Sequence, residues 1–391
     1  MAKFASDLVG MITTPETSRP VQTLFGHMPR LDGFRGVAIL LVLMGHTLTF
    51  SLHLPDHWGA IGGGGVILFF ALSGFLITGL LCNEEARNGT IDIFGFYRDR
   101  VLRIFPAFFV LLGITSVLIA LKLITDVPWY SIVVCALFLR NIFGRGDALT
   151  HIWTLSLEQQ FYAFWPLLVR FVKCRRILPW ALSAVVLVTL WRTAAIFLKL
   201  WNFESGRYYV RPDFRLDSIL IGCCLALALY RPRDTAVAPD RTGHPLLHQI
   251  ARLAHPLWVL PAFVAWTVAT CSSVALRPWF VTVQMTLAGL LLLNVVLCDE
   301  SVWARWLASG WLRKIGQFSY SIYLWQQMFL VEKSPDWGWV RVFPFDISLA
   351  CIAGVASYYL IERPFLKWKT TLRARSQPVS VASSFLSGSS I

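Results

Sequence analysis

Three side chains in the stretch LDGFRGVAILLVLMGH would lie on one stripe of a helix, and one of them, a histidine, is of a type that can do acid–base chemistry. Asp32 and Arg35 come near its start, and His46 follows Arg35 by eleven residues. At about 1.5 Å per residue, His46 lies roughly 16 Å along a helix from Arg35. Eleven residues return to within about 20° of the same direction, so the two side chains share a face. A neutral imidazole there could accept a proton from a hydroxyl group, or attack an acyl donor itself.

The composition places these polar residues in a membrane. The chain has 391 residues, of which 56% are hydrophobic and 15% are charged. Too few polar groups remain to cover soluble domains of this size, which excludes a water-soluble enzyme. The net charge of +13 is spread between apolar segments, so it favours membrane topology and no nucleic-acid partner. His46 is then either a functional group facing protein or water, or a histidine bonded to a neighbouring helix.

The apolar segments predict an all-α, polytopic membrane protein with about ten transmembrane helices around a central cavity. Helices are expected because they satisfy their own backbone groups in hydrocarbon, and each segment approaches the roughly 20 residues that a crossing needs. Trp129 to Phe143 is shorter and carries Arg140, and we expect it to enter the membrane without crossing. Basic loops on the inner side then place both termini in the cytoplasm. The predicted spans are 37–54, 64–82, 104–124, 151–170, 177–200, 214–230, 256–273, 280–298, 316–332 and 346–362.

The two ends of the chain are expected to lie outside this transmembrane domain. Residues 1–30 lack the apolar core of a cleaved signal, which predicts a cytoplasmic leader before the domain at 31–365. Residues 366–391 are first basic and then rich in Ser and Val, which predicts a disordered cytoplasmic tail. The run from Gly62 to Gly65 lacks a P-loop lysine and is expected to be a flexible loop. The eight cysteines have no metal-ligand spacing, so no metal is expected.

Segments spread from Leu31 to Phe365 resemble, in order, the motifs of the acyltransferase 3 family. The first is the arginine and histidine pair of Arg35 and His46, preceded by Asp-Gly-Phe. The resemblance implies an O-acyltransferase of the bacterial inner membrane that modifies cell-envelope or secreted glycans, with Arg35, His46 and Glu158 in its catalytic site. The other matching segments are GVILFFALSGFLIT (65–78), FYRDRVLRIFP (96–106), HIWTLSLEQQFYAFWP (151–166), FRLDSILIG (214–222), FSYSIYLW (318–325) and IERPF (361–365).

The donor that this resemblance implies is a cytoplasmic acyl-coenzyme A. Acetyl-CoA is the first expectation and succinyl the alternative acyl group. Arg98, Arg100 and Arg103 lie at the inner end of the third span, and the last two share a face. They could clamp the phosphates of the donor, or they could only fix the orientation of the span.

A second polar set is expected on the outer side, where a polysaccharide, a lipopolysaccharide or a lipid-linked oligosaccharide would bind. Glu158 is expected about 10 Å below the outer surface, with Tyr162 one turn further along its helix. Arg215 and Asp217 lie near the outer end of another span. Each charge costs up to about 3 kcal/mol in a membrane unless it is paired, so these residues are expected to cluster. Glu158 and Arg215 form either a structural ion pair or part of the acceptor site.

One position departs from the family pattern. Many relatives carry a histidine after Tyr-Leu-Trp, whereas here Gln326 and Gln327 follow Trp325. Gln326 is expected at the depth of His46, and an amide cannot relay a proton as an imidazole does. It could instead hydrogen-bond a carbonyl group or the imidazole, which leaves His46 as the one strong candidate base at that depth.

Two other functions compete with glycan acylation. In a transporter of glycans or lipid-linked sugars, His46, Glu158 and Asp217 would line a pathway for the substrate or for protons. A membrane-bound O-acyltransferase of the lipid-modifying kind also uses a histidine in the membrane, but the order of the motifs argues against it.

Overall fold

The computed structural model describes residues 28–143, 148–200, 210–230, 245–272, 279–298, 300–331 and 338–376, and within these ranges the chain forms helices and no strands. The all-α prediction is therefore confirmed. Most of the predicted leader, residues 1–27, lies outside the described residues. The longer helices are α2 (Pro29–His46), α3 (Ala60–Asn88), α4 (Ile93–Ala120), α7 (Ile152–Val172), α8 (Leu178–Phe197), α9 (Pro212–Leu229), α11 (Pro256–Ser272), α12 (Phe280–Leu297), α14 (Gly310–Leu330), α15 (Phe345–Ser357) and α16 (Arg363–Ser376). The shorter helical segments are η1 (Thr47–Ser51), η2 (Asp56–Trp58), α5 (Trp129–Ala136), α6 (Arg140–Phe143), α10 (Pro245–Leu253), α13 (Val302–Leu307), η6 (Gly338–Arg341) and η7 (Tyr358–Glu362).

Each predicted span overlaps one of the longer helices, but fewer than ten of them are apolar enough to be assigned as crossings. Six helical stretches of the described chain have the length and hydropathy of a membrane span, and the bent pair of α10 and α11 would make a seventh. The three other predicted spans, α7, α9 and α14, are not among these stretches. Ten crossings therefore remain a prediction. The six stretches are Pro29–Ser51, Ala60–Asn88, Ile93–Ala120, Leu178–Phe197, Phe280–Leu297 and Phe345–Arg373.

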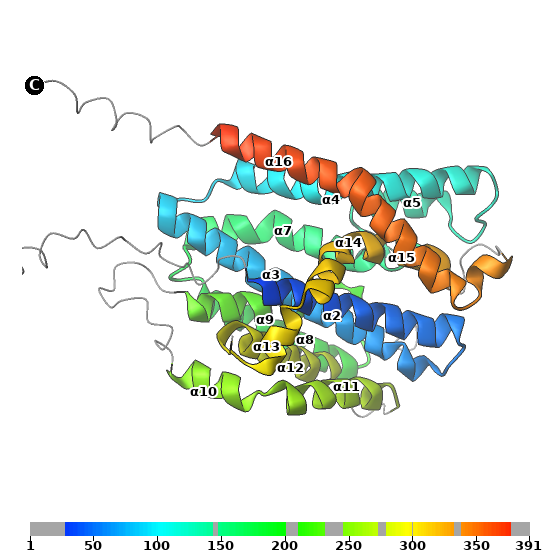
Figure 1. Ribbon diagram of the computed structural model, residues 1–391. Coiled ribbons are helices and arrows are strands. Elements are labelled where there is room, and N and C mark those ends of the chain that lie inside the picture. The colour runs from blue at the N-terminus through cyan, green and yellow to red at the C-terminus, as the bar shows by residue number, and fades with distance from the viewer. Residues whose placement is uncertain are drawn as a thin grey trace, which may run out of the picture.

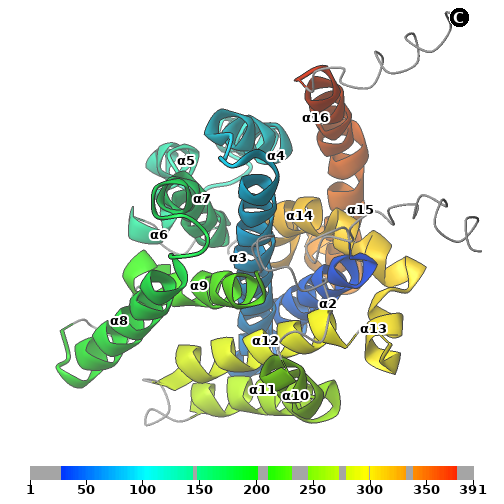
Figure 2. The same ribbon diagram turned by 90° about the vertical axis from the view of Figure 1, so that its left-hand side faces the viewer.

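Helix α3 occupies the middle of the bundle and organises it. Viewed along the helices, α2, α9 and α12 surround α3, and α8 projects away from the rest (Figure 2). Its glycine run, expected to be a flexible loop, is helical instead. A Cβ atom on Gly65 would lie 2.9 Å from Val42 Cγ2 and 3.1 Å from the Val42 nitrogen. Gly65 is thus needed for the close approach of α3 to α2, and the run forms no loop.

The segment from Trp129 to Phe143 forms two short helices, α5 and α6, separated by residues 137–139. Phe138 has a φ of 54°, and its carbonyl oxygen accepts a hydrogen bond of 2.9 Å from Gln160 Nε2 of α7. Arg140 is buried, and its Nη1 donates to Ser131 Oγ at 3.0 Å. Protein groups therefore satisfy the irregular backbone and the buried charge, as a non-crossing segment requires. That this segment does not cross the membrane remains a prediction.

The chain after Phe365 differs from the prediction of disorder. Residues 363–376 form α16, which continues from α15 through the π-helical turn η7 and lies beside α4 (Figure 1). The basic composition that suggested disorder is compensated because Lys369 and Arg373 form ion pairs with Asp99 of α4. The rest of the predicted tail, residues 377–391, lies outside the described residues.

The close packing of α3 on α9 predicts that Gly222 tolerates no larger side chain. A Cβ atom on Gly222 would lie 2.8 Å from the Phe75 nitrogen, which is backbone and cannot move independently of α3. We expect Gly222→Ala to destabilise the protein by about 1–3 kcal/mol, measured as an earlier thermal unfolding in far-ultraviolet circular dichroism. Gly113→Ala is the control because a Cβ atom there would meet no atom within 4 Å. Equal unfolding temperatures for the two variants would contradict the prediction.

Candidate active site

Five helices, α2, α3, α4, α7 and α14, enclose a pocket of about 130 Å³ that collects several of the predicted site residues. Arg35 reaches it from α2, and Arg100 and Arg103 reach it from α4. Glu158 and Tyr162 of α7 line the same pocket. The three arginines and the glutamate come from segments far apart in the sequence, and the fold brings them together. A pocket with three guanidinium groups and one carboxylate is suited to binding an anion.

Hydrogen bonds fix the polar wall of this pocket. Ser73 Oγ and Tyr162 Oη lie 2.6 Å apart, and the Arg100 guanidinium lies 5.6 Å from the centre of the Tyr162 ring. Tyr320 Oη donates to the Ile104 carbonyl oxygen at 2.7 Å. The Arg100 Nε atom is buried without a hydrogen-bond partner among the described residues.

Ser73 and Tyr320 had not been assigned to the site from the sequence. Ser73 faces the pocket, whereas the next residue, Gly74, packs against α9: a Cβ atom there would lie 3.1 Å from the Cys223 nitrogen. Ser73 lies within the apolar run VILFFALSGFLIT, which carries no signal of a polar pocket.

His46 is held by Gln326, the first residue after the Tyr-Leu-Trp sequence of α14. His46 Nδ1 and Gln326 Oε1 lie 2.6 Å apart, and the Gln326 side chain is fully buried. The oxygen accepts a hydrogen bond from Nδ1–H, which leaves the lone pair on Nε2. Of the two partners expected for Gln326, the structure places it on the imidazole. The pair is therefore arranged so that Nε2 can accept a proton.

His46 does not line the arginine pocket, but it lies close to one end of it. Tyr323 of α14 lines the pocket, and Gln326 follows three residues later, about one helical turn further along. The His46 side chain is partly exposed, and its ring centre lies 5.9 Å from that of Phe50. The base candidate and the cationic pocket thus lie at neighbouring levels of the bundle.

A second histidine, His151, lies at the start of α7 beside Gln327. The His151 Nδ1 atom is 3.1 Å from Gln327 Oε1, and its Nε2 atom is 3.0 Å from the Leu324 carbonyl oxygen. Tyr323 Oη donates to the backbone carbonyl oxygen of His151 at 3.1 Å. Both ring nitrogens and the backbone of His151 are therefore engaged with α14. The sequence motif included His151, but nothing in its spacing indicated that it would fix the helix that carries Gln326.

Two residues of the predicted outer site lie elsewhere. Asp217 is buried in an ion pair with Arg192 of α8, with its Oδ2 at 2.7 Å from Nη1. Arg192 also donates to Thr282 Oγ1 at 2.7 Å, so the pair joins α8, α9 and α12. Arg215 lies with its guanidinium 5.8 Å from the centre of the Trp153 ring. Neither Arg215 nor Asp217 lines the arginine pocket.

Glu158 was expected beside Arg215, but the structure places it in another group of residues. Glu158 and Tyr162 line the pocket with Arg100 and Arg103, and Arg215 does not. His151 and Ile152 are buried, so the start of α7 is covered by other parts of the protein. The depth of Glu158 in the membrane remains a prediction.

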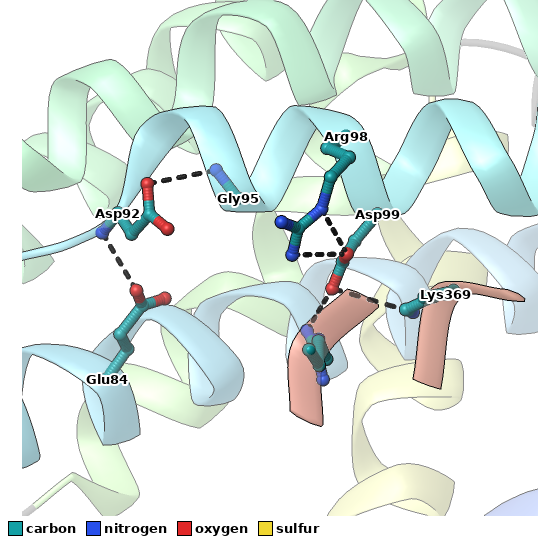
Figure 3. Close-up of polar contacts among 7 residues, drawn as sticks. Glu84, Asp92, Gly95, Arg98, Asp99 and Lys369 are labelled. Carbon is teal, nitrogen blue, oxygen red and sulfur yellow. Dashed lines mark hydrogen bonds and ion pairs between the residues drawn. The ribbon is translucent and has the colours of Figure 1, made fainter. Parts of the chain in front are cut away.

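Arg98 also separates from the two arginines that follow it. It does not line the pocket, and its Nη2 lies 3.3 Å from Asp99 Oδ1 (Figure 3). Residues two positions apart on a helix point about 200° apart, so Arg98 and Arg100 cannot both face the pocket. In the described part of the chain no three His, Cys, Asp or Glu side chains are grouped to hold a metal ion.

Comparison with known proteins identifies this arrangement. The family model of an acyltransferase domain, Acyl_transf_3, matches residues 28–361. The chain belongs to this acyltransferase family. The family's multi-pass membrane character agrees with the apolar helices. The matched range includes α2 to α15 and contains every helix that lines the pocket, while α16 follows it.

Three relatives from two species illustrate how far the acyltransferase match extends. O-acetyltransferase OatA of Staphylococcus aureus is 28% identical over 372 residues, covering 87% of this chain and 57% of OatA. YrhL of Bacillus subtilis, named as a candidate peptidoglycan O-acetyltransferase, is 28% identical over 365 residues, 86% of this chain and 55% of YrhL. SAS0844 of S. aureus, named as a candidate O-acetyltransferase, is 28% identical over 87% of this chain and 58% of its own length. The chain spans little more than half of these relatives, and no solved structure matches it.

The bond between His46 and Gln326 predicts a single tautomer of the imidazole. We expect nitrogen-15 NMR of labelled protein to show His46 protonated on Nδ1, and Gln326→Leu to abolish that preference. The same variant should lower acyl transfer by at least about tenfold, since 1.4 kcal/mol of lost positioning corresponds to that factor. Gln249→Leu, on the exposed side of α10, is the matched control. A wild-type signal from Gln326→Leu would contradict the assignment.

Proposed function

We propose that this protein transfers an acyl group, acetyl in the first instance, from a cytoplasmic acyl-coenzyme A to a hydroxyl group of a cell-envelope glycan. The observation that carries the proposal is a cationic pocket lined by Tyr323, one helical turn before Gln326, which holds His46 with its Nε2 left to accept a proton. The phosphates of the donor would bind near Arg100 and Arg103, at the end of the bundle where α4 begins. That end would face the cytoplasm, with both termini, and the acceptor would approach from the opposite side through a bundle of ten crossings.

The proposed chemistry uses His46 as a general base. Nε2 accepts the hydroxyl proton while the oxygen attacks the thioester carbonyl carbon, and Gln326 Oε1 stabilises the imidazolium through Nδ1–H. A carbon–oxygen bond forms, the carbon–sulfur bond breaks, and the leaving thiolate takes the proton back from Nε2. The proton and the electron pairs balance, and no further reactant is needed.

The remaining site residues have positioning roles in this proposal. Arg35 would bind the donor, and Glu158 would balance the charge of the arginines. Tyr162 lies beside Arg100 and within hydrogen-bond distance of Ser73, so both would help to hold Arg100 against the donor phosphates. Arg215 and Asp217 lie outside the pocket and would act on the acceptor side. Arg215 would do so from its position beside the Trp153 ring, and Asp217 by keeping its helix rigid through the ion pair with Arg192.

The relatives favour one class of acceptor. The name of YrhL refers to peptidoglycan, and we propose a peptidoglycan-like glycan ahead of an exopolysaccharide or a lipopolysaccharide. The inner membrane of a bacterium is the proposed location. No structural observation favours the alternative of a glycan transporter.

Removal of the base should abolish the modification of the glycan without removing the protein. We expect mass spectrometry of envelope glycans to show loss of the acyl mass in a deletion strain and in His46→Ala, because a positioned general base contributes roughly 10²–10⁴-fold. His248→Ala on α10 is the matched control. Normal acylation by His46→Ala would exclude His46 as the base, and proton-coupled glycan flux without acyl loss would favour a transporter.

The arginine pocket predicts a selective effect on the donor. Arg103→Ala should raise the KM for acetyl-CoA by roughly tenfold, as expected for losing a charge-assisted contact of about 1.4 kcal/mol, and change the acceptor KM much less. Arg103→Lys keeps the charge but not the paired donors, and it should have an intermediate effect. Arg305→Ala, exposed on α13, is the control. An equal rise in both KM values for Arg103→Ala would argue against donor binding here.

A further inference from the structure

Helix α16 adds a strongly basic segment to the end of the bundle where α4 begins. Its sequence RPFLKWKTTLRARS contains basic residues and no acidic residue, and it follows the range matched by the family model. Figures 1 and 2 show α16 running alongside α4. A helix of this charge needs an anionic partner, either in the protein or bound to it.

The protein provides one buried carboxylate for three of the neighbouring cations. Asp99 of α4 is 2% exposed, and it forms ion pairs with Arg98, Lys369 and Arg373. The Lys369 Nζ atom lies 3.8 Å from Asp99 Oδ2 (Figure 3). Glu84 of α3 and Asp92 at the start of α4 are further carboxylates in this region, and Glu84 Oε1 accepts a hydrogen bond of 2.8 Å from the Asp92 backbone nitrogen (Figure 3). Positive charge around Asp99 is therefore only partly neutralised.

The cations paired with Asp99, which are Arg98, Lys369 and Arg373, lie next to the arginine pocket. Arg100 and Arg103 follow Asp99 by one and four residues on α4, and both line the pocket. The Lys369 side chain is only 16% exposed, and Arg373 next to it is 51% exposed. A lysine has three donors and an arginine five, so both retain donors after pairing with Asp99. The donors thus extend from the pocket to the exposed edge of the bundle.

We propose that Lys369 and Arg373 bind the phosphates at the nucleotide end of the thioester donor, and that Asp99 positions both side chains for this contact. The inference rests on the proposed function and extends the donor site beyond the family domain. The ligand class is a nucleotide that carries a diphosphate and a phosphomonoester. Phospholipid headgroups offer the same phosphate chemistry, so the experiment has to separate the two sources.

The test measures binding of coenzyme A and of dephospho-coenzyme A to the full chain by calorimetry. The protein is held in nanodiscs of zwitterionic lipid, so that no anionic headgroup competes. We expect the double variant Lys369→Gln/Arg373→Gln to bind coenzyme A roughly tenfold more weakly, and to lose discrimination against the ligand without the phosphomonoester. Lys367→Gln, exposed and two residues from Lys369 on the helix, should bind as the wild type does.

A charge-preserving variant separates binding from folding. Lys369→Arg/Arg373→Lys should retain the affinity for coenzyme A within about threefold, because both positive charges remain. Weakening by this variant equal to that of the glutamine variant would indicate a structural role for α16 and overturn the proposal. So would unchanged binding in the glutamine variant, or a defect confined to nanodiscs with anionic lipid. If the wild type transfers acetyl from acetyl-CoA and the glutamine variant is unaffected, only this inference fails; if the wild type neither binds nor uses acetyl-CoA, the proposed function fails as well.

Discussion

The free-energy cost of burying charge in an apolar bundle is the constraint on which this structure depends. A charged side chain at the centre of a span costs up to about 3 kcal/mol on insertion scales, and more when it cannot reach water. The protein meets this cost by collecting charges from different helices, as in the pair of Arg192 and Asp217 and in the pocket that holds Arg100 and Glu158. The helices that carry these groups are therefore placed where other helices cover them. The need to pair and cover buried charges therefore determines both the packing of the helices and the polar interior of the bundle.

The candidate site follows from the same arrangement, with α14 as the connecting element. Its residues Tyr320 and Tyr323 line the pocket, and Gln326 holds the imidazole of His46 one turn beyond. His151 fixes this part of α14 to the start of α7 through the Leu324 carbonyl oxygen. A base, its orienting partner and an anion pocket are thus supported by a single rigid helix. Such support keeps reacting groups within the narrow tolerances that catalysis needs.

The sequence was sufficient for the helices, because apolar length and helical periodicity are local properties. It also offered the imidazole of His46 as one of two partners for Gln326, since both residues were expected at one depth. It did not bring Glu158 to the arginine pocket, because the neighbours of α7 depend on how distant helices pack around it. Nor could it anticipate α16, whose order depends on Asp99, more than 260 positions earlier in the chain. Contacts between distant segments therefore account for most of what the sequence left open.

The π-helical turn η7 has a consequence for comparing this chain with its relatives. A π turn accommodates one residue more than an α turn, while the helix on either side keeps its facing direction. Loss of one residue within 358–362 would convert the π turn into an ordinary α-helical turn, and the side chains of α15 and α16 would keep the directions in which they face. Loss of one residue elsewhere in α16 would rotate everything after it by about 100° and carry Arg373 away from α4. Homologues that differ in length by a single position are thus expected to place the gap in this turn, where Glu362 accepts its hydrogen bond from Ser321.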